Sequence, residues 1–373
     1  MSRRVTSLVG QAVPEPPVRE LDREPRSIAL VRLRTGLGDL LCSVPAVRAL
    51  RARLPTAHIA LITFAEMKPV VDRQRPYVDE LLAFPGWPGI PERPIDHDAI
   101  PGFLARCAER NFDLAIQMYG ARPAANAVAE ALGARRVAGF FAPGAWPPPS
   151  FDGFLPYPEH LHEVDRHLAL MDLLGAPPAG HALEFPVGGD DLEEAAALRE
   201  RHGLDGDYVL VHPGATSASR RWPPERFAAV ADALAADGLR VGVSGVRGEE
   251  AVTRAVAGGM RAPAVDLCAQ TSLGGFAALL QGARLLVCSD TGAAHLAAAL
   301  GVPAVVVFLS GDPLRWSHAG HRAARVPVGC NPCSHLDCPI DHRCATLLPA
   351  TDVLAQARAA LDDRSRMAGP AAP

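Results

Sequence analysis

The segment Leu285–Leu309, LLVCSDTGAAHLAAALGVPAVVVFL, contains a complete structural unit. LLVCS is an apolar run of strand length, and GVPAVVVF is a β-branched run that follows a turn-forming break. The Ala-rich residues between these runs are therefore predicted to form a crossover helix. A strand, a helix and a second strand in this order predict a right-handed βαβ unit of a parallel sheet, and hence an α/β fold.

Polar residues gather where the first of these strands ends. Ligands of parallel sheets bind beyond the carboxyl ends of the strands, which is where Asp290, Thr291 and Gly292 lie. The free N–H groups and the dipole of the helix start favour a phosphate there. His295 follows Thr291 by four residues and shares its helix face. The alternative is that Asp290 or Thr291 only caps the helix, which explains the aspartate but not a histidine on an Ala/Leu helix.

The same organisation appears in two successive halves of the chain, the second of which contains this segment. Ser27–Leu33 reads as a strand, and it is followed by a glycine turn, an amphipathic helix and the strand AHIALIT, as in the opening of a doubly wound domain. The pattern restarts near Asp190 with a helix and the strand YVLVHPG. We predict a flexible tail at 1–26, Rossmann-like domains at 27–180 and 181–363, and a second tail at 364–373. Two long Pro/Gly-rich loops, 85–101 and 139–160, are expected near the cleft.

Composition limits the class of protein. A chain of 373 residues with 49% hydrophobic content is long enough for two domains with large cores. A formal net charge of -4 provides no basic field, so nucleic acid is not expected as a partner. The first residues lack the apolar core of a signal peptide, and charged residues interrupt the most apolar region before it reaches the length of a membrane span. We therefore expect a cytoplasmic protein.

Three loops that follow predicted strands are expected to open onto one cleft: 34–40, 212–222 and 289–295. The first, RTGLGDL, has two glycines that allow a ligand to approach the backbone, but it lacks the third glycine of the Rossmann fingerprint. Asp39 lies at the start of the helix that follows this loop. Read alone, the segment leaves both a capping role and a catalytic role open for Asp39.

The second loop carries hydroxyl groups and cations. Thr216, Ser217 and Ser219 precede Arg220 and Arg221, a set that suits a diphosphate. The alternative is a hydrophilic loop before a helix that begins at the adjacent prolines.

These segments resemble the bacterial heptosyltransferases and related glycosyltransferases of family 9. The likeness runs from about Ile28 to Val353 and includes RTGLGDLLCSVPAVRALRARLP, HEVDRHLALMDLLG, VHPGATSASRRWPPERF, SDTGAAHLAAALGVPAVVVF and CNPCSHLDCPIDHRC in the order typical of the family. The resemblance implies the GT-B fold, in which two Rossmann-like domains face each other across a cleft. It also implies inverting transfer of a sugar, heptose from ADP-heptose, to a lipopolysaccharide core or another surface glycan.

Position by position, the resemblance implies roles for individual residues. Asp39 is implied as the general base, and Arg220 stands where many members have a lysine that stabilises the departing diphosphate. The implied donor contacts are Thr216, Ser217, Asp290, Thr291, Gly292, His295 and an acidic residue of VRGEE, either Glu249 or Glu250. The implied acceptor contacts are Gly38, Gln117 and Arg122.

The resemblance also sets expectations for cofactors and partners. No cofactor is required, and the partners are a nucleotide-diphosphate sugar and a saccharide or glycolipid acceptor, with peripheral contact to the inner face of the membrane. Two alternatives remain: a nucleotide-sugar epimerase of similar fold, and a nucleotide-sugar-binding protein without activity. An epimerase needs additional carboxylates in the cleft, and Asp39, Asp290 and His295 argue against a decayed site.

Four of the eight cysteines are clustered near the carboxyl terminus. Cys330, Cys333, Cys338 and Cys344 are interleaved with two histidines in a spacing that is not that of a standard zinc finger. The pattern leaves a structural zinc site and free thiols open, and disulfides are disfavoured in a cytoplasmic chain.

Overall fold

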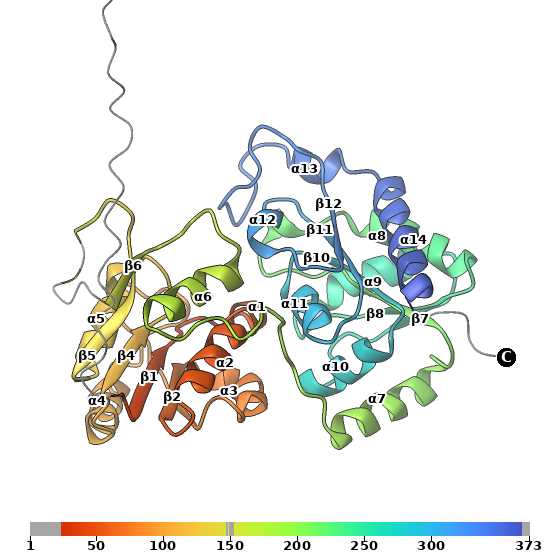
Figure 1. Cartoon of the computed structure of the whole chain (residues 1–373). Helices are drawn as coiled ribbons and strands as arrows, with labels where there is room; N and C mark the ends of the chain where they lie inside the picture. Colours follow the sequence, from red (N-terminus) through yellow and green to blue (C-terminus); the bar gives the residue numbers. More distant parts are fainter. Residues whose placement is uncertain (1–23, 147, 149–152, 368–373) are drawn as a thin grey trace, which may run out of the picture.

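The computed structural model describes residues 24–146, 148 and 153–367. Its strands form two separate parallel sheets, each with six strands (Figure 1). The predicted tails at 1–26 and 364–373 lie largely outside the described residues. In the described part of the chain, the last helix continues to Met367, which is beyond the predicted domain end at residue 363.

The first sheet has the strand order β3-β2-β1-β4-β5-β6. Strand β1 (Ser27–Val31) lies inside this sheet and pairs in parallel with β2 on one side and β4 on the other. In this register Ile28 is the partner of Ile59 and of Leu114. All residues of this strand except Ser27 are buried, as its β-branched and apolar composition predicts. The strands are β1 (Ser27–Val31), β2 (His58–Thr63), β3 (Glu80–Ala83), β4 (Leu114–Gln117), β5 (Arg136–Phe141) and β6 (Phe154–Pro156). The α-helices are α1 (Leu37–Leu41), α2 (Val44–Arg53), α3 (Lys68–Val71), α4 (Ala99–Glu109), α5 (Pro123–Ala131) and α6 (Glu163–Leu173), with 3-10 turns η1 (Ala65–Met67) and η2 (Asp72–Gln74).

The second sheet has the order β12-β11-β10-β7-β8-β9. The segment 285–309 forms β10, α11 and β11, which confirms the predicted parallel βαβ unit. The strands are β7 (Tyr208–His212), β8 (Arg240–Val243), β9 (Ala264–Asp266), β10 (Leu285–Ser289), β11 (Ala304–Val307) and β12 (His321–Ala324). The helices are α7 (Gly189–His202), α8 (Pro224–Ala236), α9 (Glu250–Gly259), α10 (Leu273–Gly282), α11 (Gly292–Ala299), α12 (Pro313–Trp316), α13 (Arg343–Thr346) and α14 (Ala350–Met367), with a 3-10 turn η4 (Ala218–Arg220).

One predicted loop contains a strand. The sequence predicts a Pro/Gly-rich loop at residues 139–160, but Phe154–Pro156 forms β6 and pairs with the end of β5. A strand of three residues shows no alternation that could distinguish it from the surrounding turn residues. The pairing with β5, a long-range interaction, is what defines it.

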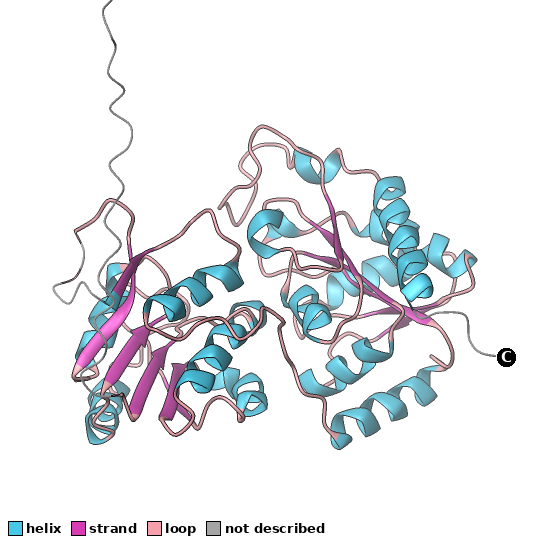
Figure 2. Cartoon of the chain, viewed as in Figure 1, coloured by secondary structure: helices cyan, strands magenta, loops and turns pink. Residues whose placement is uncertain are grey.

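The two halves meet through helices α1 and α11, which lie side by side at the centre of the molecule (Figures 1 and 2). The two helices can approach this closely because each has a glycine at the contact. A Cβ atom at Gly38 would clash with the imidazole of His295, and one at Gly292 would press on Leu37. The loops that follow β1 and β10 are therefore brought together at the carboxyl ends of both sheets.

None of the helices in the described part of the chain combines the length and the apolar character that crossing a bilayer requires.

Candidate active site

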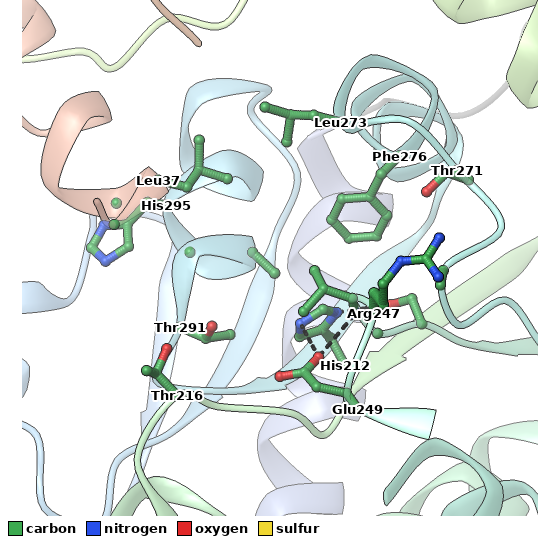
Figure 3. A pocket seen from close by; sticks show the side chains of 18 of the residues that line it. Leu37, His212, Thr216, Arg247, Glu249, Thr271, Leu273, Phe276, Thr291 and His295 are labelled. Atoms are coloured by element: carbon green, nitrogen blue, oxygen red, sulfur yellow. Dashed lines mark hydrogen bonds and ion pairs between the residues drawn. The ribbon is translucent and has the colours of Figure 1, made fainter. Parts of the chain in front are cut away.

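A cavity of about 560 Å³ lies at this junction and is lined by both halves of the chain (Figure 3). The first half contributes Thr35–Asp39, and the second half contributes loops that follow β7, β8, β9 and β10. Nine of the predicted site residues line it: Gly38, Asp39, Thr216, Arg220, Glu249, Asp290, Thr291, Gly292 and His295. Residues from three predicted loops thus share one cavity, as their positions after strands indicate.

Asp39 is the carboxylate that the first half presents to this cavity. It is the third residue of α1, whose N-cap is Gly36, and its side chain is 27% exposed. Among the described residues, no backbone N–H donates to the Asp39 carboxylate, whereas Arg32 Nη2 lies 3.4 Å from its Oδ1 and donates to its backbone oxygen at 2.8 Å. The arginine therefore orients the carboxylate, which remains accessible to a ligand.

Behind Asp39 lies a buried ionic network centred on Glu163, which sequence reasoning missed. Arg32 Nη2 is 3.3 Å from Glu163 Oε1, and Arg315 Nη2 is 2.8 Å from Oε2. Arg166 and His167 lie within 3.6 Å and 3.4 Å of the same carboxylate. Because Arg315 comes from the second half and Glu163 from the first, this network also joins the two halves.

The network determines the charges of its members. Although burial alone would raise it, contacts with His167, Arg32 and Arg315 hold the pKa of Glu163 well below its usual range. Burial and the nearby Arg32 lower the pKa of His167 to about 4. Glu163 is consequently an anion and His167 a neutral ring near neutral pH, and the net positive charge faces Asp39 through Arg32.

The opposite wall of the cavity carries groups suited to phosphate. Thr216 follows β7, Arg220 ends η4, and Thr291 is the N-cap of α11 without a side-chain capping bond. The Arg220 side chain is 39% exposed, with Nε 3.7 Å from Asp290 Oδ2. A half-exposed guanidinium, two hydroxyls that have no hydrogen-bond partner among the described residues, and a helix start form a site for an anion.

Asp290 is buried, with only 3% of its surface exposed, and its Oδ2 has no hydrogen-bond partner among the described residues. Burial raises the pKa of this carboxyl, and Arg220 partly opposes the effect. A Cβ atom at Gly311 would overlap Oδ2, so the absence of a side chain there leaves this oxygen its space. A buried acceptor without a donor at the edge of a cavity is suited to a hydroxyl group of a ligand.

The far end of the cavity is apolar on one side and acidic on the other. Phe276 lies 5.8 Å from the His212 ring, and Glu249 Oε2 accepts a hydrogen bond from the Val246 N–H at 2.9 Å (Figure 3). Burial lowers the pKa of His212, so the ring is neutral. Of the two acidic candidates in VRGEE, Glu249 lines the cavity, whereas Glu250 is the first residue of α9 and is absent from the lining.

Three predicted contacts do not line the cavity: Ser217, Gln117 and Arg122. Gln117 is fully buried, and its amide bonds its own loop, including the Tyr119 N–H at 2.7 Å and the Gly120 oxygen at 2.9 Å. Arg122 is exposed and is the N-cap of α5. The acceptor role of both residues stays a prediction. Because the Gln117 amide is bonded to Tyr119 and Gly120, Gln117 would affect an acceptor only by positioning the loop that contains these two residues.

The loop that carries Cys330, Cys333 and Cys338 holds the loop that follows β7 in place. Ser219 Oγ donates to the His335 oxygen at 2.6 Å, and the Ser219 N–H donates to the Leu336 oxygen at 2.9 Å. In the described chain the thiols of Cys330, Cys333, Cys338 and Cys344 do not form a group with metal-ligand spacing; Cys42, His295 and His318 do. Both interpretations of the four cysteines, a structural zinc site and free thiols, therefore stay predictions.

Sequence reasoning also missed residues that line the cavity itself. His212 is the last residue of β7 and opens the predicted cleft loop 212–222, but the sequence predicted no role for its side chain. Phe276, Leu273 and Trp316 offered no signal, because an apolar residue on a helix is usually part of the core.

Known proteins resemble this chain over most of its length. The sequence model of glycosyltransferase family 9 (heptosyltransferase) matches residues 104–343. Lipopolysaccharide heptosyltransferase 3 of Escherichia coli strain K12 is 23% identical over 295 residues, which cover 75% of this chain and 81% of that protein.

Solved structures agree with the predicted fold. The E. coli ADP-heptose LPS heptosyltransferase II matches with a TM-score of 0.69 and 19% identity, covering 91% of this chain and 99% of that one. The E. coli heptosyltransferase WaaC with ADP-2-deoxy-2-fluoro heptose matches with a TM-score of 0.60 and 18% identity, covering 92% of this chain and all of that one. These likenesses confirm the predicted GT-B architecture.

Proposed function

Because the chain belongs to glycosyltransferase family 9 (heptosyltransferase), we propose that it transfers heptose from ADP-heptose to a hydroxyl of a lipopolysaccharide core or related surface glycan. The observation that carries this proposal is the arrangement in one cavity of an accessible carboxylate from one half, Asp39, and an anion site from the other, formed by Thr216, Arg220 and the start of α11. WaaC was solved with an ADP-heptose analogue, which supports ADP as the nucleotide.

The donor is assigned to the wall of the second half. The diphosphate lies against Arg220, Thr216 and the N–H groups at the start of α11, where cationic and dipolar groups stabilise it. The nucleoside extends toward Phe276, with the ribose at Glu249, whose Oε2 is already used by Val246 and whose Oε1 is therefore assigned to a ribose hydroxyl.

The sugar then lies between the diphosphate and Asp39. Asp290 Oδ2, the buried acceptor without a partner, is assigned to a sugar hydroxyl. His295 Nε2 lies near Gly38 at the contact between the two halves. In this arrangement the anomeric carbon lies between Asp39, which faces the acceptor hydroxyl, and the leaving diphosphate. Direct displacement requires this order of groups.

The reaction is a single displacement. Asp39 accepts the proton of the acceptor hydroxyl as its oxygen forms a bond to the anomeric carbon. The bond from that carbon to the β-phosphate oxygen breaks, and ADP leaves with the electron pair. Arg220 and the start of α11 stabilise the charge that develops on the diphosphate. Attack from the side opposite the leaving group inverts the anomeric centre.

The test combines binding with turnover. Titration calorimetry with ADP, GDP and UDP is expected to show preference for ADP, and incubation with ADP-heptose and lipopolysaccharide-core acceptors is expected to give a heptosylated product of inverted configuration by NMR. A donor that is altered without any acceptor would indicate an epimerase, and ADP-heptose binding without turnover would indicate a binding protein. Either result would overturn the proposal.

We expect Arg220→Ala to weaken ADP binding and to slow transfer by roughly a hundred- to a thousandfold, as the loss of one stabilising donor in a water-poor site typically does. Arg220→Lys keeps the charge but not the fork of donors, so it should retain a larger part of the activity. Calorimetry with ADP and initial rates with ADP-heptose measure both effects.

Arg221→Ala is the matched control. Arg221 is the neighbouring exposed arginine, bonds the Ala215 oxygen at 3.0 Å and does not line the cavity. Equal losses for the two alanine variants would mean that the loop, and not the Arg220 charge, is responsible.

A further inference from the structure

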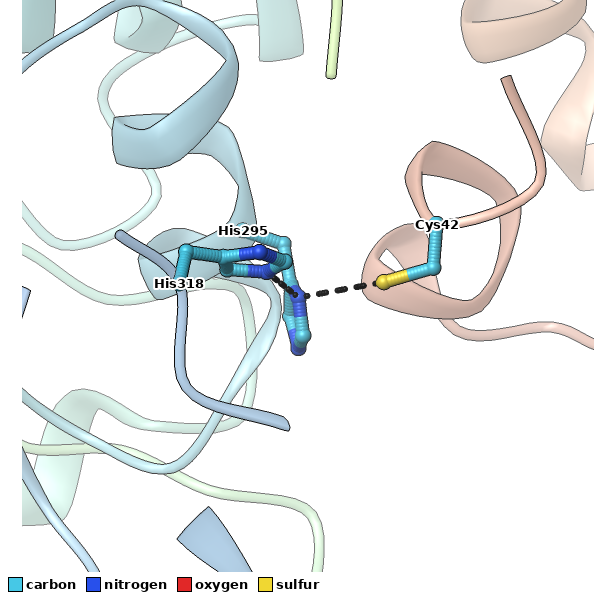
Figure 4. Close-up of side chains that lie close together, drawn as sticks. All are labelled: Cys42, His295 and His318. Carbon is cyan, nitrogen blue, oxygen red and sulfur yellow. Dashed lines mark hydrogen bonds between the residues drawn. The ribbon is translucent and has the colours of Figure 1, made fainter. Parts of the chain in front are cut away.

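Three metal-ligating side chains converge where the two halves meet, at the edge of the donor cavity (Figure 4). Cys42 caps the end of α1, His295 belongs to α11, and His318 follows α12. Cys42 Sγ is 3.5 Å from His295 Nδ1, which is 2.7 Å from His318 Nε2. Cys42 is fully buried and His295 is 5% exposed.

A single hydrogen bond at His295 Nδ1 can serve only one of its two neighbours. His295 Nδ1 faces both partners, but an imidazole nitrogen offers either one proton or one lone pair. If Nδ1 donates to His318, the Cys42 thiol faces an N–H group. If Nδ1 accepts from His318, the thiol must share the same lone pair. A cation between the three atoms removes this conflict.

We propose that Cys42, His295 and His318 bind one Zn²⁺ ion between the two domains. A thiolate with two imidazoles suits borderline-soft zinc, and three protein ligands leave a fourth position for water. Zn–S bonds of about 2.3 Å and Zn–N bonds of about 2.0 Å place tetrahedral ligand atoms about 3.3–3.6 Å apart. The distance from Cys42 to His295 fits already, and His318 Nε2 must withdraw from His295 Nδ1 by about half an ångström. All three atoms lie within 4.8 Å of one another, so small rotations of the side chains can complete the site.

The surroundings are compatible with metal entry. His295 is buried and His318 is half-buried, and a neutral imidazole ring keeps a lone pair for a metal. His318 also lines a second cavity of about 480 Å³, together with His162, Asp165 and His181. This cavity shares no lining residue with the donor cavity, so an ion could reach His318 without passing the nucleotide.

The ion would do two things. It would link Cys42 of the first domain to two ligands of the second, and so restrain opening of the cleft. It would also fix the His295 tautomer, because a metal at Nδ1 leaves the proton on Nε2, the nitrogen near Gly38. Binding converts the Cys42 thiol to a thiolate and releases its proton to solvent.

The test uses the full-length chain, stripped with a chelator, reloaded with Zn²⁺ or Co²⁺ and freed of excess metal. It is carried out in the wild-type chain and in a Cys330→Ser/Cys333→Ser chain, which removes the cysteine-rich loop as a source of ligands. We expect the double variant to retain one zinc per chain by elemental analysis and to show a thiolate-to-cobalt charge-transfer band.

Cys42→Ser and His318→Gln in this background should each abolish the band and the retained zinc, whereas Cys107→Ser, which changes a buried thiol elsewhere, should keep both. Circular dichroism monitors folding, and if Cys42→Ser does not fold, His318→Gln decides. The proposal is overturned if the double variant retains no zinc, or if a folded Cys42→Ser or His318→Gln variant retains the full amount.

Discussion

Asp39→Asn is expected to transfer sugar about a hundred- to ten-thousandfold more slowly than the wild type, because that is the usual contribution of a general base. The variant should still fold, since Asn matches Asp in size and Arg32 keeps its bonds to the Met118 oxygen and to Glu163. ADP should bind as before, because the proposed partner of Asp39 is the acceptor hydroxyl. Calorimetry with ADP and turnover at saturating donor measure these two properties separately.

Asp98→Asn is the matched control for this change. Asp98 is exposed, and it is the N-cap of α4 without a side-chain capping bond. It should leave both turnover and ADP affinity unchanged. If Asp39→Asn keeps wild-type turnover with its cognate donor and acceptor, Asp39 is not the base.

Local sequence patterns predicted the fold because each unit of it is local. The β10–α11–β11 unit lies within one continuous segment, and β1 with its glycine turn lies within another. Buried parallel strands are apolar runs, which can be recognised without knowledge of their partners. The strand β6 was missed for the opposite reason, because three residues acquire strand character only by pairing with β5.

The same distinction applies to the site. Asp39, Arg220 and Asp290 each follow a predicted strand, a position that marks them as site candidates in a parallel sheet. Glu163 lies within an amphipathic helix, and its partners are 131 residues earlier, at Arg32, and 152 residues later, at Arg315. No local pattern connects positions so distant. The convergence of Cys42 with two histidines of the other half is hidden in the same way.

Glu163→Gln is expected to lower the free energy of unfolding by about 3–5 kcal/mol near neutral pH, the usual cost of removing one partner from a buried ion pair. Gln fills the same volume, so the loss would come from charge and not from a cavity. Arg32 is 1% exposed, and with Arg315 and Arg166 it would lose the anion that neutralises it. Urea denaturation measures this change: the variant should unfold at a lower urea concentration, and the midpoint and slope of the transition give the loss in free energy of unfolding.

The dependence on pH distinguishes lost charge from lost packing. The folded pKa of Glu163 lies well below its ordinary value of 4.5, so the stability it contributes is fully present above that value and is lost as the pH falls through the folded pKa. The difference between wild type and Glu163→Gln should therefore be largest near neutral pH and narrow in acid. Glu66→Gln is the control, because the pair of Glu66 with Arg93 is exposed and should contribute no more than about 1 kcal/mol. A loss at Glu163 that does not change with pH, or that equals the loss at Glu66, would show that the carboxylate does not hold the network through its charge.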